Sequence, residues 1–156
     1  MTSNSCQSPG ENGKIKLKGR CHCGRFSWEF LHPPFATRSI GNESEKDPVK
    51  GFRPARCNCS LCSMKGYIFS TFLKPSEIIW TSQSNLSDAS SYTFGTNTVH
   101  HYFCPVDGCA IAAYRDEDNG LVTDVVAVTL NCVYEADGRD FDVEDIFKRV
   151  YDGKNA

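Results

Sequence analysis

The sequence predicts a single, mainly β domain with little helix, built around clusters of cysteine. A length of 156 residues fits one domain, and a hydrophobic fraction of 40% is enough to bury a moderate core. Short runs rich in β-branched and aromatic residues alternate with turn residues along most of the chain. Nine cysteines, most of them in three clusters, are far more than a core of this size needs.

The first half of the chain predicts a strand pair and a long loop. Residues 1–13 are polar and are expected to form a disordered lead, which leaves 14–156 as the single domain. Alternating residues at 15–19 and 26–30 predict two strands. Residues 32–54 combine prolines, glycines and charges, and so predict a long loop of the kind that often serves function.

The second half predicts the main sheet. Short strands are expected at 67–72, 78–81, 92–94, 99–103 and 111–114. Residues 122–130 form the most continuous β-branched run, which predicts a central strand. Residues 142–148 are expected to make one or two helical turns, with Asp142 as the cap.

Charge and hydropathy exclude several partners. The net charge is -2, with no basic stripe for nucleic acid and no charge block for a membrane surface, so neither partner is expected. No apolar run approaches the ~18 residues that span a bilayer. The polar N-terminal residues lack the apolar stretch of a signal peptide. A cytoplasmic location is therefore expected, where thiols stay reduced.

The three cysteine clusters are Cys21 and Cys23; Cys57, Cys59 and Cys62; and Cys104 and Cys109. In a reducing compartment, clustered cysteines are more often metal ligands than disulfide partners. Two cysteines separated by one residue cannot readily bond to each other. They can share zinc, whose sulfur ligands lie just under ~4 Å apart. The sequence thus predicts that seven of the nine cysteines bind zinc, leaving Cys6 and Cys132 outside.

Seven thiolates are the number that one four-ligand zinc site and one three-ligand zinc site need together. Structural zinc fills all four positions with protein, whereas catalytic zinc keeps one position open. The two cysteine pairs would then form a closed site, and the triplet an open one. An added histidine, His100 or His101, could instead close the second site.

Several motifs resemble one family. The runs Gly19–Gly24, Cys57–Cys62 with Gly66, and His101–Cys104 are similar to those of the glutathione-dependent formaldehyde-activating enzyme family, which includes the centromere protein V group. Residues 150–154 also resemble the end of small fungal-type members, so the likeness spans about 15–154.

The resemblance implies a β-tent fold of antiparallel strands with zinc at its apex. It also implies the activity that joins glutathione to formaldehyde, a carbon–sulfur lyase reaction that yields S-hydroxymethylglutathione. A reactive zinc is implied on Cys57, Cys59 and Cys62, the expected catalytic residues. A structural zinc is implied on the remaining pairs, Cys21, Cys23, Cys104 and Cys109.

The third cluster departs from the family pattern. Four residues separate Cys104 from Cys109 where the family has two, and Asp107-Gly108 stands where cysteine-glycine is usual. Either Cys109 is the fourth ligand after an insertion, or Asp107 replaces the thiolate. Cys109 is preferred because structural zinc favours sulfur and nitrogen. Asn131-Cys132 also replaces an acidic residue that is frequent late in the central strand.

The expected function is an enzyme that uses zinc and takes glutathione as co-substrate. The open zinc would lower the pKa of the glutathione thiol, so that sulfur adds to an aldehyde carbon or leaves it. The residues that flank the triplet are candidates to steer the glutathione carboxylates: Arg56, Asn58, Ser60 and Lys65. Two alternatives stay open, a variant enzyme acting on a specialised-pathway intermediate and a non-catalytic zinc interaction module.

Overall fold

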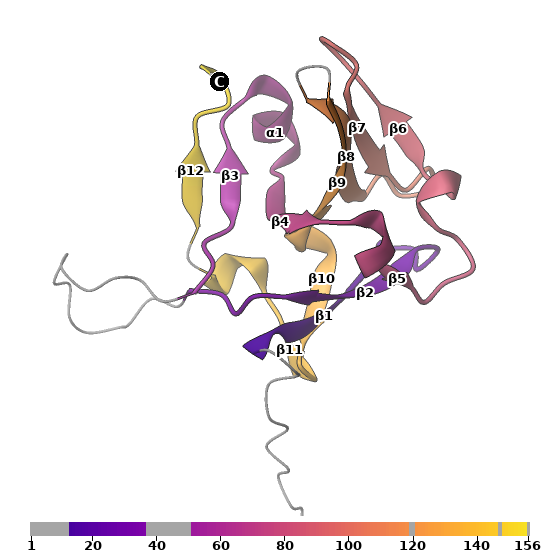
Figure 1. Ribbon diagram of the computed structural model, residues 1–156. Coiled ribbons are helices and arrows are strands. Elements are labelled where there is room, and N and C mark those ends of the chain that lie inside the picture. The colour runs from indigo at the N-terminus through magenta and orange to yellow at the C-terminus, as the bar shows by residue number, and fades with distance from the viewer. Residues whose placement is uncertain (1–12, 37–50, 119–120, 147, 156) are drawn as a thin grey trace, which may run out of the picture.

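A computed structural model describes residues 13–36, 51–118, 121–146 and 148–155. These residues form twelve strands in two sheets, together with one short α-helix (Figure 1). The predicted mainly β fold with little helix is confirmed. The expected disordered lead falls on residues 1–12, which lie outside the described ones, except for Gly13.

The smaller sheet has five antiparallel strands. The last hairpin turns at Asp137-Gly138, where both residues have positive φ, 48° and 78°. This is the geometry that a two-residue hairpin with the right-handed twist requires, and Asp-Gly is a favoured pair for it. The strand order is β11 (Arg139–Asp140), β10 (Val133–Ala136), β1 (Ile15–Arg20), β2 (Ser27–His32), β5 (Ile79–Trp80).

The larger sheet has seven strands. Its fourth strand is β9, so the prediction of a central strand near 122–130 is confirmed. Only the edge pair of β12 and β3 is parallel among the pairs of this sheet in the described residues. The order is β12 (Arg149–Tyr151), β3 (Ala55–Cys57), β4 (Ile68–Leu73), β9 (Leu121–Thr129), β8 (Ala110–Asp118), β7 (Val99–Phe103), β6 (Ser90–Tyr92).

The core lies between the two sheets. Its large buried side chains come from both sheets, from the connection between β1 and β2, and from the turn after β9: Leu17, Phe26, Trp28, Phe30, Ile111, Val126, Val128 and Leu130. Burial of this apolar surface is the main favourable term in folding. In Figure 1, the smaller sheet passes beneath the larger one, and α1 stands at the far end of the larger sheet.

His32 links the two sheets. It is fully buried at the end of β2, where its ring Nδ1 donates to the Pro33 carbonyl at 2.7 Å. Its Nε2 accepts the backbone N–H of Thr71 in β4 at 3.2 Å. Burial lowers the pKa of His32 to about 4, although the Pro33 carbonyl acts in the opposite direction. The neutral ring is therefore part of the packed interior.

Two expectations about helices need correction. The turns predicted at 142–148 reduce to a single 3-10 turn at Val143–Asp145, although Asp142 does cap it by accepting the Glu144 N–H at 2.9 Å. The helix α1, Ser60–Lys65, begins inside the second cysteine cluster and was not expected from the sequence.

The structure matches some of the expected strands better than others, and it describes only part of the expected long loop. The strand predicted at 99–103 matches β7, whereas those predicted at 78–81 and 92–94 shrink or shift to β5 and β6. Of the predicted loop at 32–54, residues 37–50 lie outside the described ones. No helix in the described part of the chain is long and apolar enough to cross a bilayer.

Candidate metal centres

Two groups of side chains have the arrangement of metal ligands. Within each group, the potential ligand atoms all lie within 4.8 Å of one another. The first, here called the Cys21 group, brings the first and third clusters together. The second, the Cys57 group, consists of the middle cluster alone. Their members are Cys21, Cys23, Cys104 and Asp107 in the first, and Cys57, Cys59 and Cys62 in the second.

The Cys21 group begins at the end of β1. The chain turns back there because the Gly24 N–H donates to the Cys21 carbonyl at 3.1 Å, with Gly24 at φ 80°. The turn brings the Cys21 and Cys23 sulfurs to 3.6 Å, and the Cys23 and Cys104 sulfurs lie 3.7 Å apart. Both distances fit the spacing of just under ~4 Å between thiolates on tetrahedral zinc.

Asp107 enters this group through a tight turn. The Gly108 N–H donates to the Cys104 carbonyl at 2.9 Å, and Gly108 has φ 76°. The Asp107 carboxylate accepts the N–H of Cys23 at 2.7 Å and the N–H of Cys109 at 2.8 Å. Burial acts to raise the pKa of Asp107, but these backbone donors outweigh it and hold the pKa well below its usual range. An ionised carboxylate therefore sits beside three thiols.

Cys109, the preferred fourth ligand, is not a member of the Cys21 group, whereas the alternative Asp107 is. Cys109 is half-buried, and burial raises its pKa. Its neighbour Cys132 donates to the Ala110 carbonyl at 3.1 Å, and burial raises the pKa of Cys132 to about 12. In the sequence, the sign that Asp107 replaces a thiolate was the dipeptide Asp107-Gly108, which stands where cysteine-glycine is usual.

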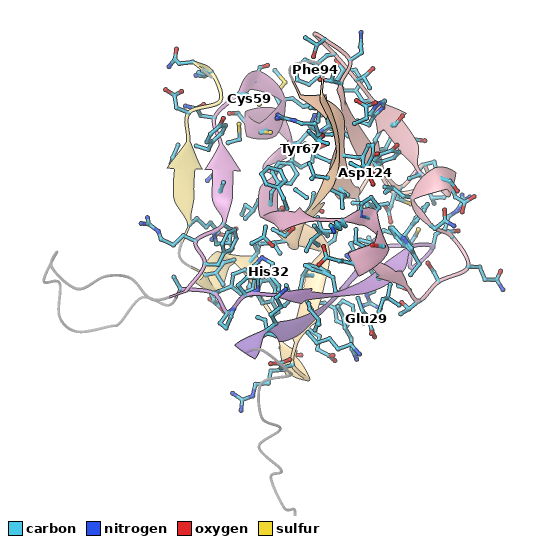
Figure 2. The ribbon with its side chains drawn as sticks, viewed as in Figure 1. Glu29, His32, Cys59, Tyr67, Phe94 and Asp124 are labelled. Atoms are coloured by element: carbon cyan, nitrogen blue, oxygen red, sulfur yellow. The ribbon has the colours of Figure 1, made fainter. Side chains whose placement is uncertain are left out.

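The Cys57 group is made by one strand-to-helix turn, at the end of the larger sheet where Figure 2 labels Cys59. Cys57 ends β3, and its sulfur accepts the Cys59 N–H at 3.5 Å. Cys59 caps α1, with its sulfur accepting the Cys62 N–H at 3.4 Å. The helix ends at Gly66 in the left-handed conformation, φ 67°, as glycine readily allows.

The three thiols of this group influence one another. Burial acts to raise the pKa of Cys59, but donors from the first turn of α1, led by the Cys62 N–H, lower it overall. Burial raises the pKa of Cys62, and negative charge at Cys57 and Cys59 raises it further. Negative charge on Cys59 therefore opposes ionisation of Cys62. A divalent cation offsets that repulsion, so the donor set of each group fits zinc.

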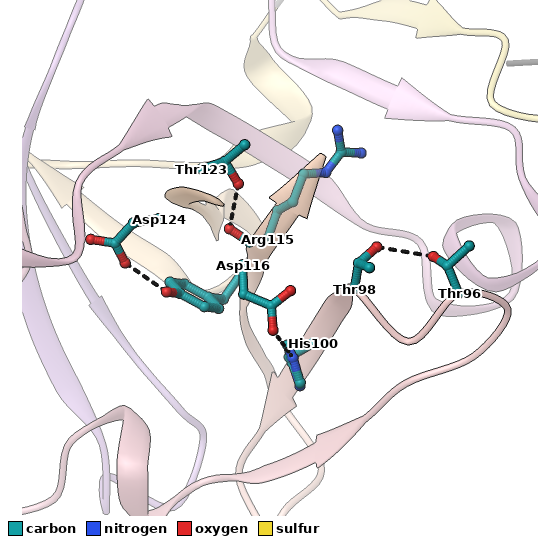
Figure 3. Close-up of polar contacts among 8 residues, drawn as sticks. Thr96, Thr98, His100, Arg115, Asp116, Thr123 and Asp124 are labelled. Carbon is teal, nitrogen blue, oxygen red and sulfur yellow. Dashed lines mark hydrogen bonds and ion pairs between the residues drawn. The ribbon is translucent and has the colours of Figure 1, made fainter. Parts of the chain in front are cut away.

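Neither histidine considered as a fourth ligand joins the Cys57 group. His100 pairs with Asp116 at 2.9 Å, next to the Tyr114–Asp124 hydrogen bond of 2.6 Å (Figure 3). His101 is buried between two aromatic rings, with centroids 5.7 Å from Tyr67 and 5.9 Å from Phe94.

An aromatic row runs outward from the Cys57 group. It consists of four rings in succession: Tyr67, His101, Phe94 and Tyr92. Its inner end lies next to the group, since the Tyr67 N–H donates to the Cys62 carbonyl at 3.3 Å. Burial raises the pKa of Tyr67, and the charge of Cys62 raises it further. Its outer end is exposed, at 46% for Phe94 and 51% for Tyr92. This row could not be predicted from the sequence, since its rings come from three separate segments of the chain.

The residues that flank the triplet have different surroundings. Arg56, Ser60 and Lys65 are exposed, so their side chains are accessible to a ligand. The Lys65 ammonium lies 5.7 Å from the centre of the Phe103 ring. Asn58 is instead held by the C-terminal residues. Asn131, expected to stand in for an acidic residue, accepts the Ile68 N–H at 3.0 Å and donates to the Gly66 carbonyl at 3.1 Å.

No protein-family model matches this sequence, and no curated protein matches it. Among solved structures, the chain is similar to a Rhodobacter sphaeroides protein described as a structural genomics target. The two chains are 22% identical, the match covers 74% of this chain and 85% of the other, and the TM-score is 0.48. A likeness of this size carries no functional argument, so function has to be argued from the two groups.

Proposed function

We propose that the chain is a zinc-dependent carbon–sulfur lyase of the glutathione-dependent formaldehyde-activating type. In this proposal the Cys57 group is the reactive site and the Cys21 group is structural. The observation that supports it is the difference in ligand number, four in one group and three in the other. Four ligands complete a tetrahedral zinc site, whereas three leave a position for a substrate sulfur.

The proposal includes Asp107, rather than Cys109, as the fourth ligand of the structural site. Its carboxylate is ionised and lies within 4.8 Å of all three sulfurs. Zinc accepts carboxylate oxygen as well as sulfur. The backbone donors from Cys23 and Cys109 orient the carboxylate, as outer-shell partners commonly do.

The chemistry at the Cys57 group is an addition and its reverse. Zinc, when bound, supplies a positive charge that lowers the pKa of a coordinating thiol. The glutathione sulfur forms a bond to the aldehyde carbon, the carbonyl electron pair moves to oxygen, and that oxygen takes the proton that the thiol gives up. Three thiolate ligands leave the site with net negative charge, which favours sulfur transfer over water activation. Arg56 and Lys65 supply exposed cations for the glutathione carboxylates.

The aromatic row favours a second candidate, a variant enzyme whose electrophile is larger than formaldehyde. Its rings are spaced 5.7, 5.9 and 5.9 Å apart and lead from beside Cys62 to the surface. The exposed rings of Phe94 and Tyr92 offer aromatic surface against which a planar aromatic group can pack. In this version, the substrate is a glutathione adduct of an aromatic aldehyde.

Calorimetric titration of glutathione into zinc-loaded protein tests the main proposal. Saturable binding of one glutathione per chain is the expected result, because one coordination position is open. Absence of binding with both groups loaded would overturn the proposal and favour the interaction module. Turnover of formaldehyde and of benzaldehyde then separates the two enzyme versions. Phe94→Ala should impair only benzaldehyde turnover, whereas Tyr134→Ala, an exposed ring on the smaller sheet, should impair neither.

A further inference from the structure

The C-terminal residues lie against the Cys57 group. β12 pairs in parallel with β3, with Tyr151 opposite Cys57. The chain then continues through Asp152, Gly153 and Lys154 past the turn that carries Cys57 and Cys59. Residues 151–154 are here called the C-terminal segment.

Asn58 ties this segment to the turn at three points. Its backbone N–H donates to the Tyr151 carbonyl at 3.0 Å. Its side-chain amide donates to the Asp152 carboxylate at 2.9 Å and accepts the Lys154 N–H at 3.0 Å. Because Asn58 stands between Cys57 and Cys59, these bonds fix the backbone that carries both thiols.

Gly153 is in direct contact with one of those thiols. A Cβ built at this position would lie 2.4 Å from the Cys57 sulfur and 3.3 Å from the Cys59 Cβ. Real side chains do not approach so closely, so an alanine here must displace the sulfur or the segment. The backbone of Gly153 is outside the left-handed region, so glycine is required by lack of space and not by conformation.

We propose that the C-terminal segment is a positioning clasp for the Cys57 group. Asn58 fastens the segment, and the bare backbone of Gly153 packs on the Cys57 sulfur, which holds the three thiols convergent. In Figure 1, α1 lies between the end of β12 and strands β6 and β7. β12 lies at one edge of the larger sheet and β7 and β6 at the other, so the clasp and the outer part of the aromatic row come from opposite edges of that sheet. This inference rests on the proposed metal site at the Cys57 group.

The test is site-resolved protection of cysteines from a maleimide reagent as zinc is titrated in, read by mass spectrometry of the cysteine-bearing peptides. In Gly153→Ala, protection of Cys57, Cys59 and Cys62 should require at least about tenfold more zinc, the usual cost of losing an outer-shell partner. Protection of Cys21, Cys23 and Cys104 should not change. Asn58→Ala should act in the same direction without adding any atoms near Cys57.

Lys154→Ala is the matched control, because it keeps the backbone N–H that Asn58 accepts and removes only an exposed side chain. It should behave like the wild type. Equal zinc protection of the Cys57 group in wild type, Gly153→Ala and Asn58→Ala would overturn the clasp alone. Equal loss at both groups in the two variants would also overturn it, because the effect would then be global. A wild type without zinc protection at the Cys57 group would instead contradict the proposed function.

Discussion

The two cysteine groups have similar ligands but occupy different places in the fold. The Cys21 group joins segments far apart in sequence, since Cys23 and Cys104 are 81 residues apart. Its Cys21 and Cys104 are fully buried, and both belong to the hydrophobic core. The Cys57 group comes from a single turn between β3 and α1, and only Cys62 is buried there.

This difference indicates which group stabilises the protein. A cross-link between distant segments restricts the unfolded chain, and the effect grows with the length of the loop it closes. A cross-link within six residues restricts it little. Metal at the Cys21 group should therefore contribute folding free energy. Metal at the Cys57 group should contribute little to the folding free energy, as expected for the proposed reactive site.

The largest effect on stability is expected from Cys104→Ser. It removes a buried ligand that ties β7 to the first cluster, and a hydroxyl is a poor zinc ligand. The free energy of unfolding in zinc should fall by roughly 4 kcal/mol or more, as for loss of a metal site. Urea unfolding followed by circular dichroism measures it. A change below about 1 kcal/mol, typical of a minor substitution, would remove the structural role of this group.

The next largest effect on stability is expected from protonation of His32, which links the two sheets. Its folded pKa of about 4 lies below the unfolded value of 6.5, so the unfolded state binds more protons between these values. The stability that the neutral ring provides is fully present above pH 6.5 and is lost as the pH falls towards 4. The loss is on the order of 3 kcal/mol.

Urea unfolding of wild type and His32→Leu at pH 7.5 and 4.5 isolates the contribution of His32 to the pH dependence of stability. His32→Leu should be less stable at pH 7.5, because the Thr71 N–H loses its acceptor. The wild type should lose more stability on acidification than the variant. Since both proteins carry the same cysteines, the pH dependence of metal binding cancels in the comparison. Parallel pH profiles would contradict the assignment of a buried, neutral His32.

A smaller effect distinguishes the two candidates for the fourth ligand. Asp107→Asn should weaken zinc binding at the Cys21 group by at least about tenfold, since it removes a charged ligand and alters the bonds to Cys23 and Cys109. Cys109→Ser should leave that affinity unchanged. Competition with a chromophoric chelator gives both values, and the opposite ranking would restore Cys109 as the ligand.

The smallest change in stability is expected from Cys59→Ser. Serine is a good helix cap, so the bond from the Cys62 N–H to residue 59 survives the substitution. The free energy of unfolding should change by less than about 1 kcal/mol. Turnover of the glutathione adduct should nevertheless be abolished, because the thiolate is gone. A stable protein with full activity would exclude Cys59 from the reactive site.

Much of the fold could be predicted because its central strands have strong local signals. The β-branched run of β9 and the alternation in β1 and β2 need no knowledge of the rest of the chain. β3 and β12 were missed because each has three residues and their pairing is parallel and long-range. The helix α1 was hidden because its cap is a cysteine, although Gly66 was an available stop signal.

The cysteine clusters could be found from spacing alone, but the sequence left the choice between Cys109 and Asp107 open and gave no sign of Gly153. Asp107 enters the Cys21 group only because the turn from Cys104 to Gly108 places its carboxylate next to the Cys23 N–H. Gly153 meets the Cys57 sulfur because a distant strand pairs with β3. The dipeptide Asp107-Gly108 was a local sign of the first contact, whereas no local pattern encodes the second.

The pairing of Asn58 with Asp152 also bears on the order in which the two cysteine groups can form during synthesis. The two residues are 94 positions apart. A ribosome adding ~5–20 residues per second needs roughly 5 to 20 s to reach the second after the first. During that interval the Cys57 thiols have left the peptidyl-transferase centre without their clasp. Cys104 follows Cys23 by 81 residues and precedes Asp152, so the Cys21 group can close first. Under the proposed assignment, the nascent chain can therefore form its structural cross-link before its reactive site is complete.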